Sequence, residues 1–199
     1  MQNINQLRKA VETTLQTIAA AVETRDSYMV GHQRRVTDLA CAIATEMNLS
    51  NRQINGLSMA GMIHDIGKIA VPEAVLNKPS KLTESEFSVI KSHPQVGYEI
   101  VKEIDFPWPV AQIILQHHER MDGSGYPLGL AGDQILLEAR ILAVADVLEA
   151  ISSNRPYRPA HSIDIALEEN TRNRGILYDK DAVDACLRIL CGKGYKMPE

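Results

Sequence analysis

Histidine and aspartate occur in this chain in combinations that are typical of metal sites. Of the six histidines, His64 is followed directly by Asp65, and His117 and His118 are adjacent. Imidazole nitrogens and carboxylate oxygens together suit iron, manganese, zinc and nickel. Further candidate ligands are His32, His93 and Asp146. The combination predicts a dinuclear metal site with hydrolytic chemistry.

The histidines differ in how strongly each one indicates a metal site. A lone histidine such as His32 or His93 is more often a core or capping residue than a ligand. The doublet His64-Asp65 is more specific, because an apolar helical run precedes it and Gly67 follows. We expect the helix to stop at Gly67 and to present both side chains at its C-terminus. The helix dipole disfavours a carboxylate there by up to ~1 kcal/mol, and a bound cation would reverse that preference.

The second motif is the stretch HHERMDGSGYP at residues 117–127, which follows the apolar run VAQIILQ. Two glycines and a proline predict that it forms a loop. With HDIGK at residues 64–68, this stretch resembles the HD-GYP phosphodiesterases, a branch of the HD-domain metal-dependent phosphohydrolases. The family pattern HHExxDGxGYP is matched at every fixed position, and the resemblance runs from about Arg25 to about Leu190.

The resemblance implies a ligand set for two divalent cations. One cation would be held by His32, His64, Asp65 and Asp146, and the other by Asp65, His93, His117 and His118. Asp65 would bridge them, since a carboxylate has two oxygens and an imidazole offers one nitrogen per metal. We expect iron or manganese, with zinc or nickel as alternatives. Some relatives hold a third metal through a Glu four residues before the first histidine. Tyr28 stands there in this chain, which predicts the two-metal version.

The resemblance also implies contacts to substrate. Lys68 matches a lysine that reaches a substrate phosphate, and Arg155 and Arg158 match positions that contact a cyclic dinucleotide. For both arginines an ordinary surface position is the alternative. Tyr126 is a candidate substrate contact or loop-ordering residue.

Three other polar residues in or near the motifs are not expected to bind metal or substrate. Glu119 and Asp122 are expected to order the loop and to orient ligands rather than to bind metal. His161 lies outside the pattern and is interpreted as a solvent-exposed or helix-start residue.

The implied activity is metal-assisted hydrolysis of cyclic di-GMP to pGpG, with further cleavage to GMP left open. Asp65 and Lys68 are the candidate catalytic residues, Lys68 stabilising charge on the phosphate oxygens. Two alternatives remain. The chain could hydrolyse another substrate, such as the mixed GMP-AMP cyclic dinucleotide, or it could be a catalytically silent module that binds a cyclic dinucleotide.

Composition and periodicity predict an all-α helical bundle, and the resemblance implies that this bundle is an HD domain with a GYP-containing loop. The chain has 199 residues, 45% of them hydrophobic and 5% aromatic, which suits one domain. Apolar residues recur at helical spacing, as in the stripe Val36, Leu39, Ala40, Ile43 and Met47. Ser50 with Gln53 and Thr83 with Glu86 predict capping boxes. Pro109 suits the first turn of the helix that precedes the two adjacent histidines.

The chain divides into a helix at residues 1–25 and a catalytic domain at residues 26–199. The helix carries an apolar stripe, made of Ile4, Leu7, Val11, Leu15, Ile18 and Val22. This stripe is expected to pack on its own domain, and the alternative is a coiled coil that dimerises the chain. Family members commonly carry an upstream sensory or receiver domain, which such a helix could connect.

The cysteines, the net charge and the lengths of the apolar runs limit the expected binding partners and cellular compartment of the protein. Cys41, Cys186 and Cys191 form no C-x-x-C pattern, and an odd number of cysteines without a signal peptide favours a reducing, cytoplasmic setting. A net charge of −4 argues against a partner that is a nucleic-acid polymer. No apolar run is long enough to predict a membrane span. Positive charge for an anionic substrate must then be local, from the metals, Lys68 and Arg155.

Overall fold

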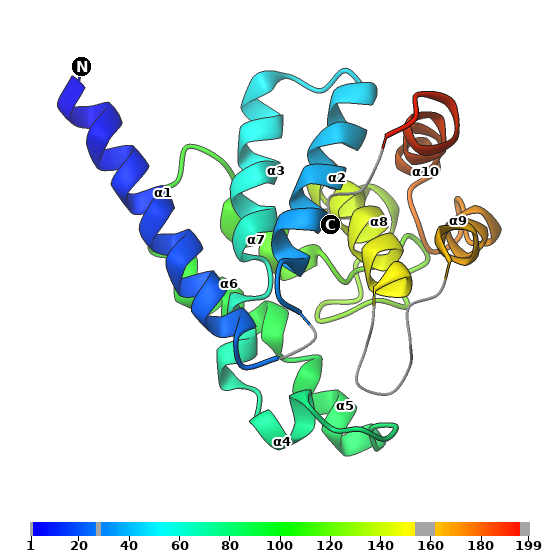
Figure 1. The fold of residues 1–199 in the computed structure, drawn as a ribbon, viewed down its shortest axis with the longest axis horizontal. Helices are drawn as coiled ribbons and strands as arrows, with labels where there is room; N and C mark the ends of the chain where they lie inside the picture. Colours follow the sequence, from blue (N-terminus) through cyan, green and yellow to red (C-terminus); the bar gives the residue numbers. More distant parts are fainter. Residues whose placement is uncertain (1, 27–28, 154–161, 196–199) are drawn as a thin grey trace.

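The chain folds as a bundle of helices in a computed structural model, which describes residues 2–26, 29–153 and 162–195 (Figure 1). The elements are α1 (Gln2–Glu23), α2 (His32–Glu46), α3 (Asn51–Ile63), η1 (Ile66–Ala70), α4 (Glu73–Leu76), α5 (Glu84–Ile90), α6 (His93–Val101), α7 (Val110–Gln116), η2 (Gly132–Gln134), α8 (Leu137–Ser152), α9 (Ile163–Arg172), α10 (Lys180–Leu187) and η3 (Arg188–Gly192). Within the described ranges, β-pairing is limited to two isolated bridges. One of them, Asp122 with Ala131, lies beside the GYP loop. The all-α prediction is confirmed.

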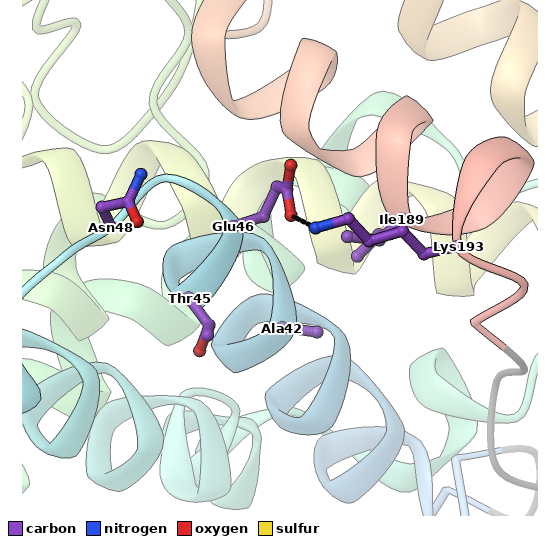
Figure 2. A pocket seen from close by; sticks show the side chains of 6 residues that line it. All are labelled: Ala42, Thr45, Glu46, Asn48, Ile189 and Lys193. Atoms are coloured by element: carbon purple, nitrogen blue, oxygen red, sulfur yellow. Dashed lines mark hydrogen bonds and ion pairs between the residues drawn. The ribbon is translucent and has the colours of Figure 1, made fainter.

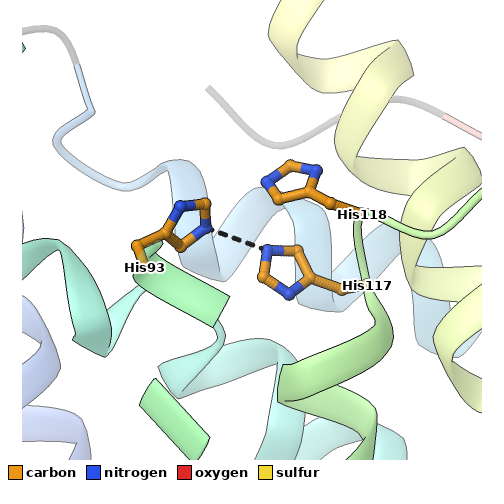
Figure 3. Close-up of side chains that lie close together, drawn as sticks. All are labelled: His93, His117 and His118. Atoms are coloured by element: carbon orange, nitrogen blue, oxygen red, sulfur yellow. Dashed lines mark hydrogen bonds between the residues drawn. The ribbon is translucent and has the colours of Figure 1, made fainter. Parts of the chain in front are cut away.

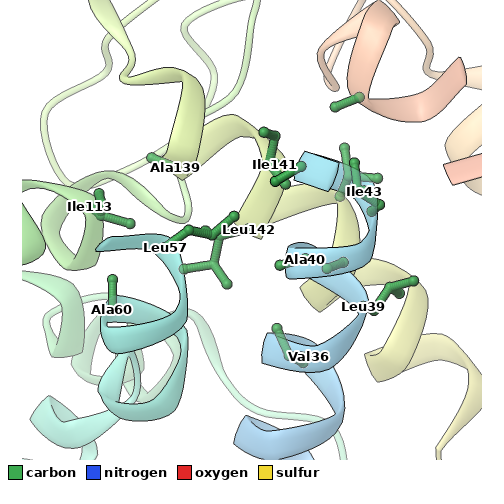
Figure 4. Packing of buried hydrophobic residues seen from close by; sticks show 14 of the residues in the cluster. Val36, Leu39, Ala40, Ile43, Leu57, Ala60, Ile113, Ala139, Ile141 and Leu142 are labelled. Atoms are coloured by element: carbon green, nitrogen blue, oxygen red, sulfur yellow. The ribbon is translucent and has the colours of Figure 1, made fainter. Parts of the chain in front are cut away.

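The core is formed mainly by α2, α3, α7 and α8, whose apolar faces meet in Figure 4. The stripe predicted on α2 is confirmed, because Val36, Leu39, Ala40 and Ile43 are fully buried. Helix α8 is apolar over most of its surface, and it lies in the middle of the bundle with α2 on one side and α9 on the other. A helix buried on several sides can hold a polar residue only where that residue has partners. Asp146 and Glu149 are the buried acidic residues of α8.

Local signals set several helix ends as expected. Ser50 and Gln53 form a capping box at the start of α3, and Thr83 and Glu86 form one at the start of α5. Each satisfies backbone N–H groups that have no partner inside the helix. Pro109 differs from its prediction, since it is the N-cap of α7 and the first helical residue is Val110.

The interpretation of Gly67 as a helix stop is wrong. Helix α3 ends at Ile63, and His64 is its C-cap. Asp65 is the N-cap of the 3-10 helix η1, and Gly67 lies inside that helix. Asp65 still directly follows the C-terminus of α3, as expected, and it also stands at the N-terminus of η1, where the helix dipole favours a carboxylate.

Gly67 is required by close packing instead. A Cβ at this position would lie 1.9 Å from the carbonyl oxygen of His93. The absence of a side chain therefore lets η1 approach the first turn of α6, bringing the segment that carries Asp65 next to His93.

Helix α1 uses only part of its apolar stripe for packing. Leu15 and Val22 are buried against the bundle, whereas Val11 and Ile18 are 42% and 43% exposed. The side chains of Ile4 and Leu7 lie outside the described residues. In Figure 1 the N-terminal end of α1 points away from the other helices. The C-terminal part of α1 packs on α3 and η1.

The C-terminal helices α9 and α10 pack apolar residues on the core, and the segment that follows α10 also forms ion pairs with the far end of α2. Lys193 and Arg188 both donate to the carboxylate of Glu46, at 2.6 and 2.8 Å. A surface hollow of about 500 Å³ lies beside this contact (Figure 2). At 1.5 Å per residue along α2 it is roughly 21 Å from His32, so it is separate from the histidine cluster. Among the described helices, none combines the length and apolarity needed to cross a membrane.

Candidate metal centre

Five helices and η1 bring the seven predicted ligands together at one point inside the bundle. His32 and His93 are the first residues of α2 and α6, and His64 and His117 cap the C-termini of α3 and α7. His118 follows directly, Asp65 precedes η1, and Asp146 lies within α8. Helix ends suit this purpose because several can converge on one volume without their backbones colliding.

Asp65 lies in the middle of the cluster. Its Oδ1 is 3.2 Å from His93 Nε2, and its Oδ2 is 3.6 Å from His64 Nε2 and 3.9 Å from His32 Nε2. The two oxygens therefore face different histidines. This is the geometry expected of a carboxylate that could serve two cations.

The donor atoms form two groups on either side of Asp65. One consists of His32, His64 and Asp146, and the other of His93, His117 and His118, with ligand atoms within 4.8 Å of one another in each group. Figure 3 shows the three rings of the second group facing one another, with His93 Nε2 3.2 Å from His117 Nε2. In the first group His32 Nε2 is 3.2 Å from Asp146 Oδ1.

Backbone carbonyls hold three of the rings in the same way. The Nδ1 atoms of His64, His93 and His117 each face the carbonyl oxygen three residues earlier, at 2.7, 2.7 and 2.6 Å. A carbonyl can only accept, so each Nδ1 carries the proton and donates it. Each Nε2 is then left with its lone pair directed into the cluster, as a metal ligand requires.

Burial and neighbouring charges favour neutral rings beside ionised carboxylates. Burial, together with the nearby His64 and His93, lowers the pKa of His117 to about 3. For Asp65 burial acts in the opposite direction, but Lys68, His64 and His93 outweigh it and hold the carboxyl pKa well below its usual value. The cluster thus offers lone pairs and negative charge at neutral pH.

His32 is the exception among these rings. Burial opposes its charged form, yet hydrogen bonds to Asp146 and Glu149 raise its pKa to about 9. A proton on Nε2 of His32 then lies between the ring and Asp146, where a cation would take its place.

The Nε2 atom of His64 is evidence for a ligand that the protein itself does not supply. Within the described part of the chain, His64 Nε2 is buried and has no hydrogen-bond partner. An unpaired buried polar atom is unfavourable by about 1–3 kcal/mol. A cation between His64, His32 and Asp146 would satisfy it, so the residues present fit a metal.

The sequence interpretation missed Glu149 and Arg35. Glu149 is fully buried and accepts a hydrogen bond from His32 Nδ1, while Arg35 Nε and Ser153 Oγ donate to its other oxygen at 2.8 and 2.7 Å. This orients the ring of His32, because the carboxylate holds the Nδ1 proton. The signal in the sequence was a second carboxylate three residues after Asp146, on the same face of an otherwise apolar helix.

The GYP loop folds back on the adjacent histidines. Glu119 is buried and accepts from the backbone N–H groups of Leu128 and Leu130, at 2.7 and 3.0 Å. A Cβ on Gly125 would lie 2.4 Å from the Cα of Glu119, so glycine is needed for this close return. The ring of Tyr126 consequently lies on His118, with centroids 4.8 Å apart.

Asp122 lies on the exposed side of the loop. Its carboxylate accepts from the backbone N–H and the hydroxyl of Ser124, at 2.9 and 2.6 Å. It therefore shapes the turn locally.

Two lysines lie beside the cluster. Lys68 Nζ donates to Asp65 Oδ2 at 2.6 Å. The exposed Lys91, which the sequence interpretation missed, places its Nζ 5.6 Å from the ring centre of Tyr126. The predicted residues Tyr28, Arg155, Arg158 and His161 lie outside the described residues.

Comparisons with known proteins identify the family of the chain. The HD domain family matches residues 16–182. The chain is 44% identical over 190 residues to the cyclic di-GMP phosphodiesterase response regulator RpfG of Xanthomonas campestris, covering 94% of the chain and 50% of the relative. It is 37% identical over 180 residues to the 3'3'-cGAMP-specific phosphodiesterase 3 of Vibrio cholerae, covering 90% and 39%. The chain spans half or less of the length of these relatives.

Solved structures show the same fold. An HDG"Y"P protein from Bdellovibrio bacteriovorus superimposes with a TM-score of 0.68 at 20% identity, over 81% of this chain and 52% of that one.

Proposed function

Since the chain belongs to the HD domain family, and to its HD-GYP branch, we propose that it is a metal-dependent phosphodiesterase that hydrolyses cyclic di-GMP to pGpG. The observation that carries the proposal is the convergence of five histidines and Asp146 around the two oxygens of Asp65. A complete, buried set of donor atoms argues against a catalytically silent module, since such modules lose metal ligands.

The proposed cofactor is a pair of divalent cations, iron or manganese. His32, His64 and Asp146 would hold one and His93, His117 and His118 the other, with Asp65 shared. The orphaned Nε2 of His64 and the three carbonyl-oriented rings support this assignment. Imidazole and carboxylate donors without thiolate suit these metals, with zinc or nickel as alternatives.

The metals would supply a lowered pKa for the attacking water and charge neutralisation for the phosphate. The chain's own residues would do the positioning. Lys68, now paired with Asp65, would turn part of its charge to a phosphate oxygen. Tyr126, which lies on His118, and the neighbouring Lys91 would contact the nucleotide beside the metals. We assign Arg155 and Arg158 to the nucleotide by their match to the family, although both lie outside the described residues.

A mixed GMP-AMP cyclic dinucleotide is the competing substrate. Identity is higher to the cyclic di-GMP phosphodiesterase, at 44%, than to the cGAMP-specific one, at 37%. Incubation of metal-loaded protein with cyclic di-GMP, 3'3'-cGAMP and cyclic di-AMP, followed by chromatography, tests the choice. We expect pGpG as the first product from cyclic di-GMP, and the absence of cleavage of all three would contradict the proposal.

Lys68→Ala separates phosphate binding from metal binding. A charge-assisted hydrogen bond is worth about 1.5–3 kcal/mol, so kcat/KM for cyclic di-GMP should fall roughly 10- to 150-fold with metal content unchanged. The matched control is Lys102→Ala, because Lys102 and Glu99 form an ion pair of the same spacing and the same 2.6 Å length away from the site. Wild-type kinetics in Lys68→Ala would remove Lys68 from the mechanism.

We also propose that α1 contacts a second copy of the chain. Val11 and Ile18 are its exposed large apolar side chains among those described. Light scattering of wild type and of a Val11→Gln, Ile18→Gln variant tests this, and an unchanged molar mass would contradict it. An upstream sensory or receiver domain stays a prediction, supported by the greater length of the relatives.

A further inference from the structure

The C-terminal end of α1 is bonded to the backbone that carries His32. The carboxylate of Glu23 accepts from the N–H of Gly31 at 3.2 Å and from the N–H of Gln33 at 2.9 Å. These are N–H groups at the start of α2, where no side chain within α2 or its N-cap supplies a cap. Glu23 therefore caps α2 from another helix, and its two oxygens hold the residues on either side of His32.

Two residues further on, Arg25 is bonded to η1. Its guanidinium donates to the carbonyl oxygens of Ile69 at 2.6 Å and Val71 at 3.1 Å, with Lys68 O at 3.4 Å. These carbonyls lie at the C-terminal end of η1, where a cation is favoured. The same short helix has Asp65 as its N-cap and contains Lys68.

Little space separates α1 from the metal centre. A small cavity of about 10 Å³ lies between the end of α1 and the segment at Asp65 and Lys68. That volume admits about one water molecule. With the bonds of Glu23 and Arg25, this close packing links the end of α1 to the segments that carry His32 and Asp65.

We propose that Glu23 and Arg25 are positioning residues, which fix the backbones of His32 and Asp65 and so couple the placement of α1 to metal affinity. The proposal rests on the proposed function of the cluster as a metal centre. Neither side chain is among the candidate ligands, so any effect on metal binding must pass through α2 and η1.

The test is a titration of Mn²⁺ into the full, metal-free chain, with free Mn²⁺ followed by electron paramagnetic resonance. Changes of residues that orient ligands typically weaken metal affinity by about 10- to 100-fold. We expect Glu23→Ala and Arg25→Ala each to weaken Mn²⁺ binding roughly 10-fold. Glu23→Gln keeps one acceptor oxygen and Arg25→Lys keeps the charge, so both should recover part of the loss.

Two controls separate positioning from general stability. Asp179→Ala removes the cap of α10, a helix that carries none of the seven candidate ligands, and should lower stability without changing the Mn²⁺ dissociation constant. Lys9→Ala removes an exposed charge from α1 and should change neither. Hydrogen exchange should speed up at residues 31–33 in Glu23→Ala and at residues 66–71 in Arg25→Ala.

The inference is overturned if Glu23→Ala and Arg25→Ala bind Mn²⁺ like wild type while losing as much stability as Asp179→Ala. Should either alanine variant fail to fold, Glu23→Gln and Arg25→Lys decide by the same comparison. If wild type itself binds no Mn²⁺, iron or zinc, the proposed metal centre fails and this inference with it. That result differs from one in which the metal binds but its affinity is unaffected by the substitutions of Glu23 and Arg25.

Discussion

Individual side chains in this site are prepared for their roles by short, local contacts. Three ring Nδ1 atoms donate to the carbonyl three residues earlier, so each tautomer is set by the same helical turn that carries the ring. Asp65 combines one local partner, Lys68, with partners from distant parts of the chain. Its two oxygens face histidines from three helices and the ammonium of Lys68. Binding of both cations therefore depends on Asp65 more than on any other single residue.

Asp65→Asn should remove most bound metal and the activity while leaving the helices intact. An amide offers one neutral oxygen where two cations need an anion. Elemental analysis measures the metal, and circular dichroism measures the helical content. Full metal occupancy with normal turnover would show that Asp65 does not bridge.

Glu149→Gln tests the orientation of His32. The amide can still accept from His32 Nδ1 but no longer supplies the charge that holds the ring and Arg35 together. Metal affinity should fall about 10-fold or more. Glu138→Gln, at the start of the same helix, is the control and should leave affinity unchanged. Equal affinities in the two variants would limit Glu149 to a structural role.

At the scale of elements, the site depends on close approaches that only glycine permits. Gly67 allows η1 to contact α6, and Gly125 allows the GYP loop to return onto Glu119 and Arg120. In both places the clashing atoms would belong to backbone, which cannot rotate away as a flexible side chain can.

Gly67→Ala should lower the free energy of unfolding by about 3 kcal/mol or more, because its Cβ would lie 1.9 Å from His93 O and the helices would have to separate. Metal content should fall as well, since Asp65 and His93 move apart. Gly192→Ala, where the added carbon meets nothing within 4 Å, should be nearly neutral. Urea unfolding measures both, and equal stabilities would contradict the packing argument.

On the scale of the whole molecule, the bundle joins ligands that are more than a hundred residues apart, from His32 to Asp146. Bound metal should therefore stabilise the entire fold. At a metal concentration 100 times the dissociation constant the gain is about 2.7 kcal/mol.

Two transition metals per chain are expected, because Tyr28 stands where a third would need a carboxylate. Elemental analysis of anaerobically purified protein gives the count, and chelation should lower the Tm. A reproducible three metals per chain would mean that another residue supplies the missing ligand.

Features that depend on residues close together in the chain were predictable from the sequence. Capping boxes at Ser50 and Thr83 and the buried stripe of α2 follow from spacings of three or four residues, which one helical turn brings together. The motifs at residues 64–68 and 117–127 also identified the family and the donor types before any distance was known.

How those donors meet depends on contacts between parts of the chain that are far apart in sequence. Glu149 contacts a ring 117 residues away, and Glu23 caps a helix other than its own. Gly67 looked like a local helix stop, yet it serves a contact with His93 from a different helix. Such contacts leave no periodic trace in the sequence, because they depend on which surfaces the folded core brings together rather than on spacing along the chain.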